Sequence, residues 1–465
     1  MKSVEHIKQR LAHCQALNPR LNAFVDMFSE QAMAQAHACD AALARGESLG
    51  PLHGTAVSVK ECFQLRGSKS TVNYPPLRNY QAEVTSPLIQ RLFDAGAVVL
   101  GKTNVPALLA DAQTFGPLYA TANNPYDLSC TPGGSTGGGA AAVAAQLVDI
   151  ELGSDIGGSI RNPASFCGLF GLKPTENGHA GDGHIPPLPG SQTGISVMNS
   201  TGPLTRTASD LTRAYKVLFQ PDWQQGTYLP VARSQVKPAT LAGYRFGYLD
   251  TIMGLQPGSE VQRAMDTTVA DLTARGASVK KLSLDPQLAR ELLSLWAELF
   301  GFMMGQSLSW PVRKVLYWRF SKLLKSSSLP AGKALRAGLG LDLKRFSRAL
   351  SRRQEIIAEI NRCYAGVDCV INPTALGPAF PHNPGHKPIL LDGVPVPYVD
   401  YCFPFVMLYN LTGQPVLTVP AGQTQSGLPI GLSFAAGHHQ EPTLLHLAQL
   451  LESAGYRYHA PDIIT

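Results

Sequence analysis

Two glycine-rich blocks constrain the fold of this chain more than any other feature of its sequence. Residues 130–139 (CTPGGSTGGG) and 153–159 (GSDIGGS) place serines among consecutive glycines. Such glycines permit sharp turns and leave backbone N–H groups open to a ligand. Between the blocks, 140–147 reads as a buried helix and 148–153 as a strand. This order of loop, helix, strand and loop predicts a layered α/β domain whose reactive groups lie on loops.

The remainder of the chain continues the alternation of helices and strands. Short apolar runs predict strands at 55–59, 97–100, 369–373, 416–419 and 430–435. Helical spacing of apolar residues predicts helices at 3–17, 29–46, 83–95 and 441–454. Residues 177–203 are rich in Gly, Pro and Ser and should be mostly loop. The 465 residues are enough for one large domain or two fused layers.

Residues 289–353 differ in character from the segments on either side. Their first part is aromatic and rich in methionine, including Trp296, Phe300 and Trp318. Their second part, between Arg313 and Arg353, holds twelve basic residues and one acid. The segment is predicted to be helical. Its apolar part suits either a substrate pocket or an ordinary core between helices, and its basic part suits either weak peripheral membrane contact or solvated charge.

Charge and cysteine usage exclude several classes of protein. The net charge of +6 is mild for this length, and no nucleic-acid-reading motif accompanies it, so we expect no nucleic-acid partner. The eight cysteines are scattered without a CxxC pair, which predicts buried thiols rather than a zinc or redox site. No leader-like N-terminus and no apolar run of membrane-spanning length is present, so a cytoplasmic protein is expected.

Three segments place a reactive side chain beside glycine. Lys60 ends the apolar run 54–60, where burial would favour the neutral amine and so a base, although a lysine can also reach solvent along its stem. Ser135 lies in a formal G-x-S-x-G pattern, which is also compatible with an anion-binding loop. Ser159 ends the second glycine block, where a capping turn serine is the plain alternative. Together they suggest a serine nucleophile activated by lysine without histidine.

The long block from Gly153 to Thr175 resembles the hallmark of the amidase signature family, and Lys60 and Ser135 stand at matching positions. Lys60 precedes Ser135 by 75 residues, and Ser135 precedes Ser159 by 24, as in that family. The resemblance extends over nearly the whole chain, from LNPRLNAF at 17–24 to NLTGQP at 410–415 and GLPIG at 427–431. It implies a single domain over 1–465, with a mixed central sheet between helices and 289–353 as a variable helical cap over the active site.

The resemblance also implies roles for particular residues. Ser159 is similar to the acylated nucleophile, Ser135 to the serine that follows a cis peptide and relays a proton, and Lys60 to the neutral base. The implied oxyanion hole consists of the backbone N–H groups of Ile156, Gly157, Gly158 and Ser159. Supporting roles fall to Gly134, Thr136, Asp155 and Arg161. No metal or organic cofactor is implied.

Departures from the family pattern spare all three catalytic positions. Thr136 stands where a second serine is frequent, Gly139 replaces a common serine, and Ala107 replaces a frequent acidic residue. Other polar residues are expected to have structural rather than catalytic roles. Asn162 should support the nucleophile loop, His184 should be structural or line the pocket, and His438 and His439 should lie at the surface.

The leading hypothesis is a stand-alone amidase that acts on a small or medium, hydrophobic amide through an acyl-enzyme on Ser159. The same triad also suits an ester or a carbamate. A glutamine-dependent amidotransferase subunit, which releases ammonia for a partner enzyme, is a second hypothesis. A non-catalytic binding protein on the same fold is a third, and an α/β-hydrolase esterase with Ser135 as nucleophile is a fourth. The expected partners are a small-molecule amide and, by resemblance, a second copy of the chain in a homodimer.

Overall fold

A mixed β-sheet forms the centre of the computed structural model, which describes residues 2–177, 183–191, 196–219, 238–324, 327–329, 331–340 and 342–464. Within these residues the sheet has eleven strands. In spatial order they are β1 (Phe24–Met27), β3 (Val98–Thr103), β2 (Ala56–Lys60), β4 (Ile150–Asp155), β6 (Ser200–Thr205), β5 (Phe170–Lys173), β12 (Val416–Gln423), β13 (Pro429–Ala435), β9 (Cys369–Pro373), β7 (Arg245–Tyr248) and β8 (Ser278–Lys281). The predicted α/β fold with a mixed sheet is therefore confirmed.

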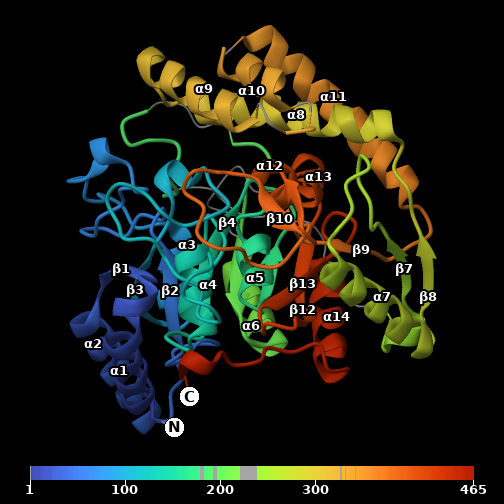
Figure 1. The fold of residues 1–465 in the computed structure, drawn as a ribbon. Coiled ribbons are helices and arrows are strands. Elements are labelled where there is room, and N and C mark those ends of the chain that lie inside the picture. Colours follow the sequence, from blue (N-terminus) through green and yellow to red (C-terminus); the bar gives the residue numbers. More distant parts are fainter. Residues whose placement is uncertain are drawn as a thin grey trace.

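Helices lie against the sheet and also form a separate layer above it (Figure 1). Those around the sheet are α1 (Ser3–Leu21), α2 (Ser29–Ala44), α3 (Pro87–Asp94), α4 (Gly137–Ala144), α5 (Arg161–Phe166), α6 (Ala208–Leu218), α7 (Ser259–Ala274), α12 (Tyr398–Cys402), α13 (Pro404–Thr412) and α14 (Glu441–Ser453). The upper layer comprises α8 (Pro286–Gly305), α9 (Trp310–Leu324), α10 (Ala331–Leu339) and α11 (Leu343–Cys363). A small hairpin, β10 (Ile389–Leu391) and β11 (Val394–Val396), stands apart from the sheet.

The sheet is mixed because it contains both parallel and antiparallel pairs of neighbouring strands. β2 runs parallel to β3 and β4, and β7 runs parallel to β8 and β9. The strands between these two groups pair antiparallel. Because β2 and β4 are parallel neighbours, their carboxyl ends at Lys60 and Asp155 meet at one edge of the sheet. This edge lies below the upper helical layer (Figure 1).

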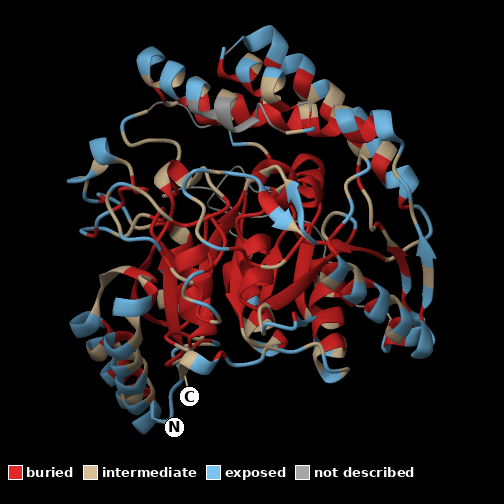
Figure 2. Cartoon of the chain, viewed as in Figure 1, coloured by how far each residue is buried: buried red, intermediate tan, exposed pale blue. Residues whose placement is uncertain are grey.

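Small residues allow α4 to lie directly on the sheet. The helix is buried over its whole length, as Figure 2 shows for the centre of the molecule. A side-chain carbon added at Gly139 would lie 2.3 Å from the Glu151 carboxyl group of β4, and one at Gly138 would lie 2.4 Å from the Asn104 backbone nitrogen. Glycine at both positions is therefore what permits this close packing.

The upper layer is joined to the core by apolar packing and by ion pairs. Glycines also bring α8 and α10 together, since a side-chain carbon at Gly338 would collide with the Glu298 carbonyl oxygen. Within the layer Arg352 pairs with Glu291 at 2.6 Å. Arg353 of α11 reaches the core, where it pairs with the buried Glu176 and donates to the Leu411 carbonyl oxygen. Part of the basic segment is therefore paired with acids rather than simply solvated.

Several boundaries differ from those predicted. The helix expected from residue 83 begins at Pro87, because the residue before a proline is disfavoured in helical geometry. The helix expected at 140–147 begins earlier, at Gly137, and ends at Ala144. The segment 177–203, predicted to be mostly loop, includes the start of β6 at Ser200; its residues 178–182 and 192–195 lie outside the described part of the chain. Among the described helices none is long and apolar enough to cross a membrane.

Candidate active site

Lys60 lies fully buried at the carboxyl end of β2, and its amine faces the two glycine-rich loops. Its Nζ is 2.8 Å from Ser135 Oγ, 3.1 Å from Ser154 Oγ and 3.2 Å from the Ser154 carbonyl oxygen. Burial lowers the pKa of Lys60 to about 8, although the nearby Cys62, Asp155 and Glu151 act in the opposite direction. The amine therefore does not reach solvent, and a sizeable neutral fraction exists near pH 8.

The loop before α4 presents Ser135 to this amine. The peptide bond between Gly134 and Ser135 is cis. Glycine is required at 134, since a side-chain carbon there would lie 2.4 Å from the Gln113 carbonyl oxygen. The Thr136 backbone N–H donates to the Ser159 carbonyl oxygen at 3.1 Å, which joins the two loops. In the described residues the hydroxyls of Ser135 and Ser159 make no hydrogen bond to each other, but both line one pocket.

Backbone N–H groups near Ser159 are unequally available to an oxyanion. Gly158, which has φ +91°, donates its N–H to Asp155 Oδ1 at 2.8 Å. The inclusion of Gly158 in the predicted oxyanion hole is therefore wrong for this geometry. Within the described part of the chain no acceptor engages the N–H groups of Ile156, Gly157 or Ser159. These three remain open to a ligand oxygen.

Asp155 and Arg161 form a buried ion pair directly behind the Ser159 turn. The pair is bidentate, at 3.0 Å from Nε to Oδ2 and 2.8 Å from Nη2 to Oδ1. Asn410 of α13 donates to Asp155 Oδ1 at 2.9 Å, and Arg161 donates to the Val406 carbonyl oxygen at 2.9 Å. Burial alone would raise the pKa of Asp155, but Arg161 and Asn410 outweigh it and hold that pKa well below its ordinary value. The pair thus fixes the turn, and neither residue is among the described residues that line the pocket of Ser135 and Ser159.

Two pockets meet at Ser159. The first, here called the apolar pocket, is lined mainly by apolar side chains of α8, α10, α12 and α13, including Trp296, Phe300, Leu335, Phe403 and Met407. The second, here called the serine pocket, is lined by Ser135, Ser154, Ser159, His184, Met303 and Met304 among others. Leu109, Ile156, Ser159 and Phe300 line both. The aromatic first part of 289–353 therefore borders the candidate site.

A buried carboxylate closes the apolar pocket on one side. Asp111 accepts a hydrogen bond from the Tyr398 hydroxyl at 2.5 Å and lies 2.6 Å from His386 Nε2. Sequence reasoning missed Asp111, His386 and Ser154. Asp111 and His386 are 275 residues apart and lie in no motif, whereas Ser154 stood inside the GSDIGGS block and could have been noted.

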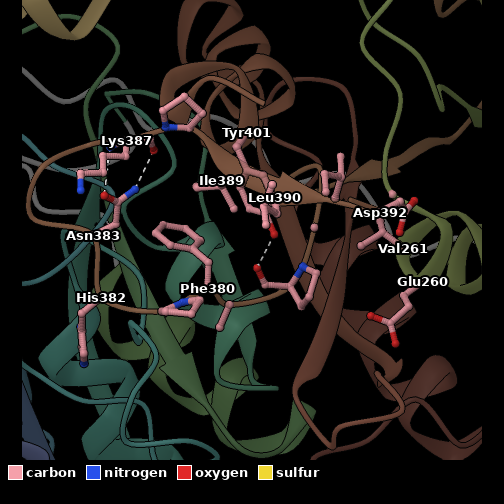
Figure 3. Close-up of a pocket in the computed structure, with 17 residues that line it drawn as sticks. Glu260, Val261, Phe380, His382, Asn383, Lys387, Ile389, Leu390, Asp392 and Tyr401 are labelled. Carbon is pink, nitrogen blue, oxygen red and sulfur yellow. Dashed lines mark hydrogen bonds between the residues drawn. The ribbon is translucent and has the colours of Figure 1, made fainter. Parts of the chain in front are cut away.

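Another pocket lies between the hairpin β10–β11 and the start of α7, as Figure 3 shows. It is lined by Glu260, Phe380, His382, Lys387 and Tyr401 among others, and it contains no residue predicted from the sequence. His438, predicted at the surface, is half-buried and bonds to the Thr412 carbonyl oxygen at 2.8 Å. No group of three or more His, Cys, Asp or Glu side chains suited to a metal ion occurs among the described residues.

Comparison with known proteins places this arrangement in a family. The family described as Amidase matches residues 5–445, which is nearly the whole chain. The chain belongs to the amidase signature family. As a member of this family it is a hydrolase of the amidase type, and the expectation drawn from the glycine–serine block is confirmed.

Within the amidase signature family, the relatives carry different names. A glutamyl-tRNA(Gln) amidotransferase subunit from Synechococcus sp. (strain RCC307) is 32% identical over 97% of this chain and 93% of its own length. A solved vestigial protein complex related to an s-triazine catabolic enzyme is 27% identical, covers 98% of this chain and 96% of its own, and has a TM-score of 0.79. A crystal structure of an amidase is 26% identical with the same coverage and a TM-score of 0.77.

Proposed function

We propose that the chain hydrolyses an amide through an acyl-enzyme on Ser159, with Ser135 as proton relay and Lys60 as base. The observation that carries this proposal is the 2.8 Å contact between the buried Lys60 amine and the Ser135 hydroxyl. A serine hydroxyl is a weak nucleophile until a base accepts its proton. A lysine whose pKa is lowered by burial to about 8 supplies that base near neutral pH.

In acylation, Ser159 Oγ forms a bond to the substrate carbonyl carbon while its proton passes to Ser135 Oγ. Ser135 in turn gives its own proton to Lys60 Nζ. The developing oxyanion is placed toward the open N–H groups of Ile156, Gly157 and Ser159. When the C–N bond breaks, Lys60 returns a proton through Ser135 to the leaving amine.

In deacylation, water takes the place of the amine and its proton follows the same path through Ser135 to Lys60. The water oxygen bonds to the acyl carbon, the ester bond to Ser159 breaks, and Ser159 Oγ recovers a proton. The products are a carboxylic acid and the regenerated hydroxyl. Esters and carbamates would enter at the same acylation step, since they carry the same kind of carbonyl carbon.

The apolar pocket favours a hydrophobic acyl or amine group. Among its described lining residues Asp111 is the one charged side chain, and both of its oxygens face protein partners. Glutamine carries a carboxylate, which proteins usually bind with arginine or lysine. The described lining supplies neither. The pocket therefore supports a hydrophobic amide better than glutamine.

The second candidate function is that of an amidotransferase subunit, favoured by the name of the Synechococcus relative at 32% identity. In that role the same relay would release ammonia from glutamine for a partner enzyme. A binding protein without catalysis is the third candidate, but the intact contact between Lys60 and Ser135 argues against it.

The proposal is tested with purified protein on a graded panel of short polar amides, glutamine, acyl anilides from acetyl to decanoyl, an aryl carbamate and an aryl ester. Ser159→Ala is the blank. We expect anilide hydrolysis that increases with acyl length and is absent from the Ser159→Ala protein. Activity on glutamine alone, together with co-purifying protein chains, would instead support the amidotransferase role.

Two outcomes would contradict the proposed mechanism. Hydrolysis that persists in Ser159→Ala but is lost in Ser135→Ala would make Ser135 the nucleophile, as in an α/β-hydrolase. Wild-type protein that hydrolyses nothing on the panel and forms no covalent adduct with an alkyl fluorophosphonate would point to a binding protein.

A further inference from the structure

His184 is joined to the proposed base, Lys60, through the hydroxyl of Ser154. The imidazole is buried against Phe63, with its ring edge-on at a centroid distance of 5.1 Å. Its Nε2 is 2.9 Å from Ser154 Oγ and 3.3 Å from Cys62 Sγ, and its Nδ1 is 3.1 Å from the Pro186 carbonyl oxygen. Ser154 Oγ is in turn 3.1 Å from Lys60 Nζ. One hydroxyl therefore separates His184 from the base.

The partner of Nδ1 determines which neutral tautomer fits. A carbonyl oxygen accepts hydrogen bonds and cannot donate, so Nδ1 carries the hydrogen that faces Pro186. Nε2 of the neutral ring is then an acceptor. The Ser154 hydroxyl at 2.9 Å and the Cys62 thiol at 3.3 Å from Nε2 each have a hydrogen to donate. Ser154 is a hydroxyl, and burial raises the pKa of the Cys62 thiol to about 12, so the thiol keeps its proton.

This tautomer fixes the direction of the hydrogen bonds at Lys60. With its hydrogen given to His184, Ser154 Oγ can only accept from Lys60. The Ser154 carbonyl oxygen, at 3.2 Å, also accepts from Lys60. A neutral amine has two hydrogens and one lone pair, so both hydrogens are then used. The lone pair is left for the remaining neighbour, Ser135 Oγ at 2.8 Å.

We propose that His184 is a positioning residue that sets the direction of the Ser135–Lys60 relay by holding the Ser154 hydroxyl as an acceptor. The inference rests on the proposed function of Lys60 as base. Without an acceptor at position 184, the Ser154 hydroxyl can turn its hydrogen toward the lysine lone pair. Lys60 would then donate to Ser135 instead of accepting from it, and the proton on Ser159 would have no path to the base.

The proposal is tested with an alkyl fluorophosphonate, which reacts with an activated serine and needs no knowledge of the natural substrate. The rate of labelling is followed by intact mass, and the labelled residue is identified by peptide mapping. His184→Leu fills the space without an acceptor, and we expect labelling about tenfold slower or more, as for loss of one buried hydrogen bond. His184→Gln offers an amide oxygen to Ser154, and labelling within about threefold of wild type is expected.

A double-mutant cycle separates direction-setting from packing. Ser154→Ala removes the hydroxyl through which His184 acts, so His184→Leu should cause no further loss in the Ser154→Ala background. His438→Leu is the matched control, because His438 also bonds to a backbone carbonyl oxygen but lies outside the relay, and its labelling rate should equal that of wild type. Thermal melting checks that each variant is folded.

Three outcomes would overturn the inference. Equal loss in the leucine and glutamine variants would indicate packing, and so would losses that add in the double mutant. Labelling by His184→Leu at the wild-type rate would show that Ser154 needs no acceptor. If the His184→Leu protein does not fold, the His184→Gln protein provides the test. Labelling of His184→Gln that is slower than labelling of Ser154→Ala would also overturn the inference. Failure of the proposed function is distinct, since wild type would then carry no label on Ser159.

Discussion

At the scale of single residues, the candidate site relies on charged groups that are shielded from water. Lys60, Asp155 and Arg161 are each buried, and each has partners on a different element of the fold. Burial makes the amine of Lys60 easier to deprotonate, while the ion pair keeps Asp155 charged. Burial favours the neutral form of both groups, but only Asp155 has an oppositely charged partner in contact, and that partner keeps it ionised.

The pKa of Lys60 predicts the pH dependence of catalysis. In the proposed mechanism the reactive form is the neutral amine, so kcat/KM should be low below the pKa of about 8 and rise to a plateau above it. A pH profile on an acyl anilide measures this limb. Lys60→Met should lower the plateau by roughly a hundredfold or more, as for loss of a general base. A wild-type profile that is flat between about pH 6 and 9 would contradict lysine as the base.

The ion pair behind Ser159 predicts a large loss of stability. Asp155→Ala leaves Arg161 buried without its carboxylate, which typically costs about 3–5 kcal/mol of unfolding free energy. Denaturant unfolding measures it. Glu47→Ala, which removes an exposed partner of Arg45, is the matched control and should cost less than about 1 kcal/mol. Because the pKa of Asp155 is lowered in the folded state, this stabilisation is present above about pH 4 and is lost as the pH falls through the lowered pKa.

The main residues of the candidate site could be predicted from the sequence, but few of their hydrogen-bond and ion-pair partners could. Lys60, Ser135 and Ser159 stood out because glycine surrounded them or because a charge ended an apolar run. Asp111 and His386 could not be found in this way, since their contact joins segments 275 residues apart in the chain. His184 was given a structural or pocket-lining role, and only the geometry of Ser154 links it to Lys60.

At the scale of elements, α8 links the upper helical layer to the candidate site. Two of its aromatic side chains, Trp296 and Phe300, stack at a centroid distance of 4.8 Å and line the apolar pocket. Trp296 also donates to the Ile156 carbonyl oxygen at 3.0 Å. The helix thus contributes both the wall of the apolar pocket and a contact to the loop that precedes Ser159.

Trp296→Ala should enlarge the apolar pocket and change substrate choice. We expect the ratio of kcat/KM for decanoyl over acetyl anilide to increase about tenfold, because a pocket discriminates by roughly 1–3 kcal/mol per methylene at its wall. Trp318→Ala on α9 is the matched control, since Trp318 is exposed and should leave the ratio unchanged. An unaltered ratio in the Trp296 variant would place the acyl group elsewhere.

α9 exposes apolar side chains to solvent. Trp310 is 61% exposed, Val315 68% and Trp318 77%, and Lys314 lies over the Trp310 ring at 3.7 Å. Exposed tryptophan beside basic residues suits the surface of an anionic bilayer, so peripheral membrane contact stays a prediction.

The measurement is co-sedimentation with vesicles that contain or lack phosphatidylserine. We expect binding to the anionic vesicles only, reduced several-fold by the double variant Trp310→Ala/Trp318→Ala. Leu390→Ala on β10 is the control, because Leu390 is 70% exposed but belongs to the hairpin β10–β11 rather than to the basic segment 313–353. Equal binding to both kinds of vesicle, or none at all, would exclude an electrostatic surface contact.

Element types were predicted better than element ends. Apolar runs located β2, β9 and β13 closely, because strands buried on both faces read as continuous apolar sequence. The exposed β8 (Ser278–Lys281) was missed, since it has no such run. The predicted start of α4 was three residues too late, because glycine is a poor helix former and Gly137–Gly139 were assigned to the preceding loop. Glycine is necessary at these positions because the helix packs closely against the sheet.

At the scale of the whole molecule, the upper helical layer and the sheet share one site, so their connection matters for function. Arg353 of α11 is buried and bonds to Glu176 and to the Leu411 carbonyl oxygen of α13. The order of strands that brings β2 beside β4 could not be predicted from the sequence, because it depends on contacts between distant segments. The resemblance to a family was what supplied the global arrangement.

Arg353→Met should loosen the upper layer, because it leaves Glu176 buried without its cation. We expect a loss of about 3–5 kcal/mol in unfolding free energy. Arg348→Met, on the same helix, is the control. Denaturant unfolding followed by tryptophan fluorescence is the measurement, since three of the four tryptophans of the chain lie in α8 and α9. A variant as stable as the control would show that apolar packing alone holds the layer in place.

The meeting of the two pockets at Ser159 has a consequence for the chemical fate of the intermediate. An acyl group held in the apolar pocket leaves the serine pocket empty once the amine departs. Whichever nucleophile enters next decides the product, so water and added amines compete for one ester. If the proposed acyl-enzyme forms, the chain should partition between hydrolysis and transacylation, and the ratio of the two products should depend on the concentration of added amine.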